Sequence, residues 1–183
     1  MHLREIFNAG SFDDSMISYE WVNATYFKHS TKLKDINKNL SLYQNQEMYL
    51  LIKDDSVIIG LLGVSNKTIL GIEYNQVDII YVFPKYRNTS AIKWLIFSVK
   101  EESKYQLIAD GAIFDKGNEL INSLIKYNIM KVSILDKDTG DISIFDKPIT
   151  DLSKCYIFEQ FNCGYYTQPF GETGPNIWYN FFD

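Results

Sequence analysis

The stretch VDIIYVFPKYRNTSAIKWLIFSVK, residues 77–100, decides the fold of this chain. Residues 77–83 are apolar apart from Asp78, as expected of a strand buried in the centre of a sheet. After a short turn, apolar residues recur at the spacing of one helix face, at Ile92, Leu95, Ile96 and Val99. The stretch therefore predicts a central strand, a turn, and a helix that begins near Ser90.

The turn between this strand and this helix suits an anionic ligand. The first turn of a helix leaves backbone N–H groups without helical partners, and the helix dipole places positive charge at the same end. Turns of this kind bind phosphate groups. We therefore expect a phosphate-bearing ligand at the turn that follows the central strand.

Periodicity and turn residues predict the elements on either side. Helices are expected at residues 11–27, where Ser11 and Asp14 resemble a capping box, and at residues 117–128. The polar stretch from Lys28 to Gln46 is interpreted as a weak helix or a loop. The expected strands are residues 2–7, a hairpin over residues 47–65 that turns at Lys53 to Ser56, residues 105–114 and residues 129–138. This order predicts an α/β fold with a mixed, mostly antiparallel central sheet flanked by helices.

Composition and charge limit the classes of protein to which this chain can belong. The chain has 183 residues, a formal charge of −5 and a pI near 5.1, without runs of Lys or Arg, so we expect no general nucleic-acid binding. The N-terminus has no signal-like apolar region and no segment is long enough to span a membrane, which predicts a cytoplasmic protein. Cys155 and Cys163 fit no zinc pattern and are expected to be free thiols. The two histidines leave little material for a histidine-based metal site, so no metal is expected.

The order of elements and the turn after the central strand resemble the GNAT family of N-acetyltransferases over roughly residues 1–140. That family carries a V-x-P-x-Y-R-G-x-G-x-G/A segment, and Val82, Pro84, Tyr86 and Arg87 occupy its first positions. The resemblance implies acetyl-CoA as cofactor, with its pantetheine beside Tyr81 and Val82. Its pyrophosphate would lie over the backbone of seven residues, which are Arg87, Asn88, Thr89, Ser90, Ala91, Ile92 and Lys93.

Three positions of this segment depart from the family pattern. Asn88, Ser90 and Ile92 stand where the family has glycines, which let the backbone approach a phosphate closely. Ile92 is therefore expected to crowd the ligand, and we expect an affinity for CoA below that of typical members. Lys93 can supply charge, and Ser90 can cap the helix or donate to a phosphate oxygen.

The resemblance also implies catalytic residues. Asn118 matches the asparagine of the family's second signature, and Leu124 stands where a tyrosine often protonates the CoA thiolate. Tyr127 is the nearest substitute for that acid. Asp78 is the candidate base, because burial would raise its pKa toward a useful range and the attacking amine must be neutral. Glu73 is the second choice for the base.

The last part of the chain is rich in aromatic residues. Ten aromatics follow Cys155, with glycines and prolines between them. We expect a GNAT-like domain over residues 1–150 and a C-terminal extension over residues 151–183. The extension either packs on its own sheet or forms an interface with a protein partner or a second copy.

Two functions remain open at this stage. The first is acetyl transfer from acetyl-CoA to an amine on a small molecule or a protein, which the intact V-x-P-x-Y-R pattern and the isolated Asp78 favour and to which we give slight preference. The second is a GNAT-like binding or structural protein without the chemistry, which the missing glycines and the missing tyrosine favour. Divergent chains of this composition also resemble bacteriophage proteins, including virion components, which would place the protein in the host cytoplasm or in the virion.

Overall fold

A computed structural model describes residues 17–46, 48–87, 91–110, 121–122, 124–126 and 130–161. The chain divides into two compact units. Unit 1 comprises Met1–Val64 and Asp78–Glu101, and unit 2 comprises Ser65–Val77 and Glu102–Asp183. The expected strand at residues 2–7 and the Ser11/Asp14 capping box lie outside the described residues.

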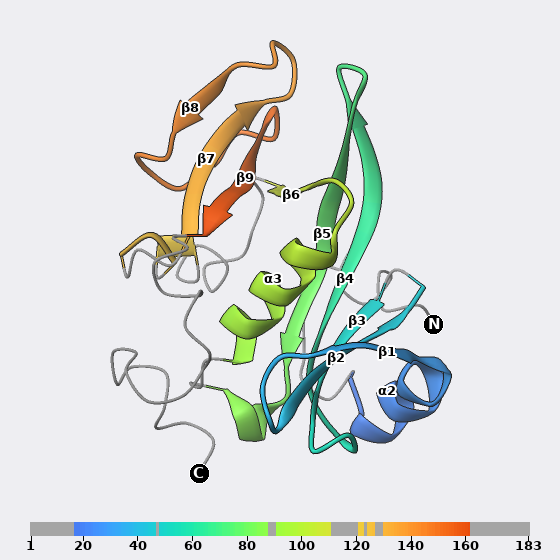
Figure 1. The fold of residues 1–183 in the computed structure, drawn as a ribbon. Helices are drawn as coiled ribbons and strands as arrows, with labels where there is room; N and C mark the ends of the chain where they lie inside the picture. Colours follow the sequence, from blue (N-terminus) through green and yellow to red (C-terminus); the bar gives the residue numbers. More distant parts are fainter. Residues whose placement is uncertain are drawn as a thin grey trace. The chain divides into compact units, whose positions relative to one another are not determined.

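Nine described strands are hydrogen-bonded in the order β1-β2-β3-β4-β5-β6-β9-β7-β8 (Figure 1). Strand β6 pairs parallel to β5, whereas β1–β2, β2–β3, β3–β4, β6–β9, β7–β9 and β7–β8 are antiparallel pairs. The sequence prediction of a mixed, mostly antiparallel sheet in an α/β fold is thereby confirmed. The strands are β1 Thr31–Asp35, β2 Leu40–Asn45, β3 Met48–Lys53, β4 Val57–Ile69, β5 Ile72–Val82, β6 Gln106–Asp110, β7 Met130–Asp136, β8 Ile142–Ile144 and β9 Lys154–Phe161.

Few helices accompany the sheet in the described part of the chain. Helix α2 spans Tyr19–Thr25, and its N-cap is Ser18, whose Oγ accepts a hydrogen bond from the Trp21 N–H at 3.0 Å. Helix α3 spans Ala91–Glu102 and connects β5 to its parallel neighbour β6. Two short 3₁₀ helices, η2 at Phe27–His29 and η3 at Pro84–Tyr86, complete the set, together with helical residues at 121–122 and 124–126.

The central strand and its following helix are as the sequence predicts. Strand β5 lies between β4 and β6, and its parallel ladder joins Tyr74–Gln76 to Gln106–Ile108. In α3 the predicted face is buried at Leu95, Ile96 and Val99, while Ile92 is half-buried. Trp94 and Ser98 are buried as well, so α3 buries a wider face than the predicted stripe.

The prediction of a weak helix or loop from Lys28 to Gln46 is wrong, because most of this stretch forms β1 and β2. Strand β1 leaves most of its side chains exposed, which accounts for its polar sequence. Strand β2 buries Leu40, Ser41 and Leu42 and pairs with β3 along its whole length. Burial of only three residues in a polar stretch is a weak signal in the sequence, and pairing with β3 overrides the local preference.

Each unit has its own apolar cluster. The cluster of unit 1 combines residues of α2, β3, β4 and β5 with one residue before α2 and one after β5. Its members are Ile17, Val22, Leu50, Ile52, Ile58, Leu61, Ile79, Tyr81 and Phe83. The cluster of unit 2 consists of Ile69, Tyr74, Ile108, Leu135, Cys155 and Ile157. Strand β9 contributes to the second cluster and pairs with both β6 and β7. The aromatic residues from 162 onward lie outside the described residues, and the division of the chain at residue 150 stays a prediction.

The β3–β4 hairpin confirms the predicted turn at Lys53 to Ser56. Asp54 and Asp55 both have positive φ, at 50° and 52°, and the Ser56 N–H donates to the Lys53 carbonyl at 3.1 Å. Two successive positive φ values match the turn that suits the twist of a hairpin. Glycine and asparagine adopt this conformation more readily than aspartate does, so the two aspartates carry some backbone strain.

We expect glycine substitutions at the two aspartates to act in opposite directions. Asp54→Gly relieves strain at an exposed side chain and should raise the stability slightly, by at most about 0.5 kcal/mol. Asp55→Gly relieves the same strain but removes a carboxylate that accepts three hydrogen bonds, so its melting temperature should fall. Thermal unfolding of the two variants would measure this difference. Equal shifts of the same sign would contradict the role given to Asp55.

Candidate functional site

The candidate site begins where β5 ends in unit 1. The Phe83 N–H still donates to the Ile59 carbonyl at 3.0 Å, and Pro84 then starts η3. Proline fixes φ near the helical value and has no N–H to leave unpaired, so it suits the first position of such a turn. The turn is closed by the Tyr86 N–H, which donates to the Phe83 carbonyl at 2.8 Å. The chain thus leaves the sheet sharply within three residues.

Arg87 ties this turn back to the strand. Its Nε donates to the Val82 carbonyl at 3.0 Å, and its guanidinium carbon lies 5.4 Å from the centre of the Tyr81 ring. Arginine commonly stacks on aromatic rings in this way. Arg87 therefore holds the turn against β5, a structural role that the sequence did not predict. Tyr81 and Val82, the residues expected beside pantetheine, are both buried.

Gly60 on β4 allows a close approach to Tyr81. A Cβ atom at Gly60 would lie 2.6 Å from the Tyr81 carbonyl oxygen and 3.2 Å from Cγ2 of Val82. Tyr81 and Phe83 also contact each other edge to face, with ring centres 5.2 Å apart. The end of β5 is thus held by backbone contact with β4 and by aromatic packing.

The first turn of α3 carries a cation and no acidic residue. Ala91 is fully buried, and Ile92 and Lys93 are half-buried. Burial lowers the pKa of the Lys93 ammonium below its ordinary value. An anion at this end of the helix would favour the charged form of Lys93. Asn88, Thr89 and Ser90 lie outside the described residues.

The candidate base is a residue of β5. Asp78 is half-buried, and its Oδ2 atom is buried. Glu73, the second choice, is exposed and accepts a hydrogen bond from the Thr68 hydroxyl at 2.5 Å. The surroundings of Asp78 are therefore closer to those required of a general base than the surroundings of Glu73.

Tyr127 and Asn118 lie outside the described residues, so their positions as acid and cofactor residue stay predictions. Leu124 is a helical residue and is fully buried, which agrees with a role in packing.

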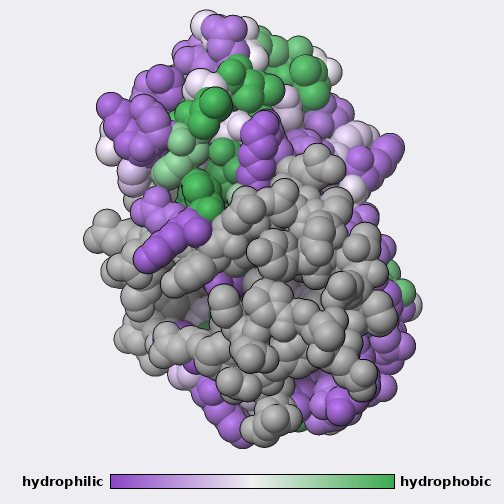
Figure 2. Space-filling view, turned by 60° about the vertical axis from the view of Figure 1, so that its left-hand side comes forward, coloured by the Kyte–Doolittle hydropathy of each residue, from purple (hydrophilic) through white to green (hydrophobic). Residues whose placement is uncertain are grey.

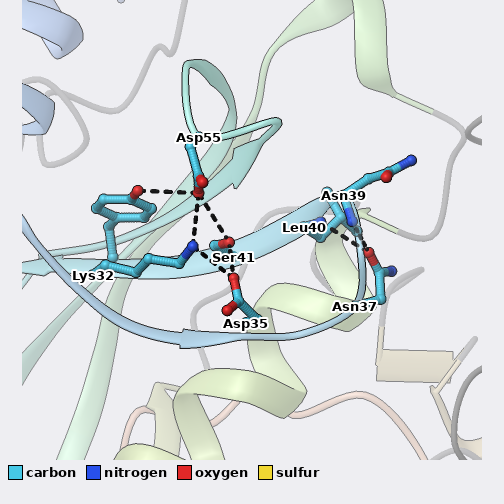
Figure 3. Close-up of polar contacts among 8 residues, drawn as sticks. Lys32, Asp35, Asn37, Asn39, Leu40, Ser41 and Asp55 are labelled. Atoms are coloured by element: carbon cyan, nitrogen blue, oxygen red, sulfur yellow. Dashed lines mark hydrogen bonds and ion pairs between the residues drawn. The ribbon is translucent and has the colours of Figure 1, made fainter.

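A polar cluster that the sequence did not predict links three elements of unit 1 (Figure 3). Lys32 Nζ lies 2.6 Å from Asp35 Oδ1 and 2.9 Å from Asp55 Oδ1. The Ser41 hydroxyl donates to the same two oxygens, at 2.7 and 3.2 Å. The Tyr43 hydroxyl donates to Asp55 Oδ1 at 3.2 Å. The cluster thus joins β1, β2 and the β3–β4 turn. Nothing in the sequence indicates that Lys32 of β1 and Asp55 of the β3–β4 turn lie close together.

The charges of this cluster suit a structural role better than proton transfer. We call Lys32, Asp35 and Asp55 the clamp, because they tie β1 to the β3–β4 turn. Hydrogen bonds from Lys32 lower the pKa of both Asp35 and Asp55, and those carboxylates in turn raise the pKa of Lys32. All three groups are therefore charged over a wide pH range around neutrality. A general base needs a pKa near the working pH, which these groups lack.

Because the clamp is made of charged groups, we expect its contribution to the stability of the protein to depend on pH. Because the carboxylate pKa values are lowered on folding, their contribution is complete above about pH 4 and disappears as the pH falls through the lowered values. The difference in melting temperature between wild type and Lys32→Met should therefore be largest near pH 7 and shrink toward pH 2. Lys38→Met, an exposed lysine in the β1–β2 turn, is the matched control. A difference that stays constant between pH 7 and pH 2 would argue against the clamp.

Unit 2 has a smaller polar group beside a buried thiol. Asp110 accepts from Gln76 Nε2 at 3.0 Å and pairs with Lys137 Nζ at 3.2 Å. Cys155, opposite Asp110 in the β6–β9 ladder, is a free cysteine, and burial raises its pKa to about 11. A thiol with a raised pKa stays protonated at neutral pH and is therefore a poor nucleophile. The prediction of a free thiol is confirmed for Cys155, whereas Cys163 lies outside the described residues.

The described residues contain neither a metal-binding cluster nor a membrane-spanning helix. No group of three or more His, Cys, Asp or Glu side chains among them is arranged to hold a metal ion. None of the described helices is long and apolar enough to cross a membrane. In comparisons with protein-family models and with curated proteins, no match to this chain was found.

Proposed function

We propose that this chain is a GNAT-like N-acyltransferase that moves an acetyl group from acetyl-CoA to an amine. One observation carries the proposal: β5 ends in a 3₁₀ turn that leads to the N-terminus of α3, and the next strand, β6, is parallel to β5. Ligands of open α/β sheets bind beyond the carboxyl ends of such strands. The Val82, Pro84, Tyr86 and Arg87 pattern lies at this turn, in agreement with the resemblance to the family.

The residues at the turn are compatible with the charge of the cofactor. The first turn of α3 lies at the positive end of the helix dipole and carries Lys93, and none of the described residues of that turn is acidic. Arg87 would act on the ligand chiefly by fixing the turn, since its Nε is engaged by Val82. Tyr81 and Val82 would line the path of the pantetheine.

The proposed chemistry assigns one proton transfer to each of two side chains. Acetyl-CoA, when bound, supplies a thioester whose carbonyl carbon bonds to the amine nitrogen while the carbon–sulfur bond breaks. Asp78 would take the proton that the amine loses, directly or through a water. Tyr127 would give a proton to the leaving sulfur.

A second candidate function is a binding or structural protein that keeps a GNAT-like fold, as a bacteriophage virion component would. The arrangement of Arg87 favours this alternative, because its guanidinium lies against β5 and the ring of Tyr81. The fully buried Leu124 at the family's tyrosine position favours it too. The two candidates differ in whether acetyl-CoA binds.

Calorimetric titration with acetyl-CoA tests the proposal. Wild type should bind, and Lys93→Ala should bind at least about tenfold more weakly, because a hydrogen bond between charged groups contributes about 1.5–3 kcal/mol. Lys100→Ala, at the other end of α3, should bind like wild type. Affinity should also fall as the pH rises through the lowered pKa of Lys93, since only the ammonium attracts phosphate. No heat of binding in wild type would reject the enzyme, and equal effects of both lysine variants would reject the placement.

A further inference from the structure

Strand β8 forms one edge of the described sheet and is exposed throughout. In the described part of the chain it pairs with β7 alone, with Ser143 opposite Ile134. Ile142 and Ile144 are 59% and 81% exposed and lie on the same face of the strand. Figure 2 shows apolar side chains on the surface of the described residues near the top of the view. An exposed apolar edge strand readily pairs with another strand.

The opposite edge of the sheet order is protected in a way that β8 is not. Strand β1 carries Lys32 and Lys34, and lysines on an edge strand disfavour pairing with another chain. Its apolar residue, Leu33, is 38% exposed, less than either isoleucine of β8. Among the described strands, β8 is therefore the edge better suited to pair with a partner.

We propose that β8 pairs antiparallel with β8 of a second copy of this chain, with Ser143 opposite Ser143. The sequence Ile142-Ser143-Ile144 is symmetric about its centre. In this register, Ile142 of each copy lies opposite Ile144 of the other on one face, and the two serines meet on the other face. Directly opposed β-branched residues stabilise paired strands. A two-fold pairing of this kind is closed and stops at two copies.

The pairing is limited to β8 itself, because residues 137–139 form the turn that precedes the strand and residue 147 is a bend. A three-residue strand buries little surface, so we expect a weak dimer that dissociates on dilution.

Disulfide trapping tests the pairing and its register together. Directly opposed residues of an antiparallel pair have Cα atoms about 4.5–5.5 Å apart, within the range that a disulfide spans. In a Cys163→Ser background, Ser143→Cys should give a reducible covalent dimer under mild oxidation, since Cys155 is buried. Leu33→Cys in the same background, on the other edge, should stay monomeric. No cross-link at Ser143→Cys, or equal cross-linking at Leu33→Cys, would overturn the proposal.

Sedimentation of chains without added cysteine gives an independent measure. Wild type should shift from monomer toward dimer as its concentration rises, whereas Ile144→Lys should remain monomeric with an unchanged melting temperature. Ile144 is mostly exposed, so this change should leave the fold intact. Leu33→Lys should dimerise like wild type. Wild type that stays monomeric up to about 1 mM, the weak limit of specific association, would contradict pairing through β8.

Discussion

Replacing Gly60 with alanine should lower the free energy of unfolding by about 3 kcal/mol, because the added methyl group has no room between β4 and β5. The added Cβ would lie 2.6 Å from the Tyr81 carbonyl oxygen, so the backbone of β4 or β5 must move. That movement would also displace Val82 and the start of the turn. Chemical denaturation of Gly60→Ala beside wild type would measure the loss.

Gly63→Ala is the matched control on the same strand. Its Cβ would lie 3.1 Å from Cε of Met48, the far end of a flexible side chain that can move aside. We expect this variant to lose much less stability than Gly60→Ala. Equal losses would mean that alanine is unfavourable at any glycine position of β4. That result would contradict the close approach to Tyr81 as the cause.

Asp78→Asn should reduce the rate of acetyl transfer by about 10²–10⁴-fold, the usual contribution of a general base. The amide keeps the shape of the side chain but cannot accept the proton of the amine. Affinity for acetyl-CoA should change little, because Asp78 is proposed to act on the acceptor. Steady-state rates over a range of amine concentrations would separate the two effects.

Glu73→Gln provides the comparison, since Glu73 lies on the same strand and is exposed. This variant should transfer acetyl groups at the wild-type rate. If Glu73→Gln loses the rate and Asp78→Asn keeps it, the base has been assigned to the wrong carboxylate. If both keep it, proton removal depends on another group or on water.

Strong local patterns in the sequence predicted the centre of the fold. The apolar run before Pro84 became β5, the helical spacing after Ser90 became α3, and the two aspartates after Lys53 became the hairpin turn. In each case burial and local backbone preference favour the same structure. These are the elements that position the candidate turn.

Other features depend on contacts that the local sequence does not specify. Strand β1 is mostly exposed, so its polar residues gave no strand signal. Strand β9 pairs with β6 and β7, which lie far from it in the sequence. The hydrogen bond from Arg87 to Val82 and the clamp of Lys32, Asp35 and Asp55 depend on the three-dimensional path of the backbone. The partners of these side chains therefore could not be predicted from a single sequence.

Release of CoA thiol by wild type tests the central claim most directly. The protein would be incubated with acetyl-CoA and a panel of small amines and lysine-containing peptides, and free thiol would be followed over time. The native thiol of Cys155 is buried, and a sample without acceptor gives the background. The proposed acyltransferase predicts thiol release that depends on both acetyl-CoA and one class of amine, with an acetylated product of matching amount. Thiol release no faster than the background across the whole panel, in a protein that also fails to bind acetyl-CoA, would contradict the account.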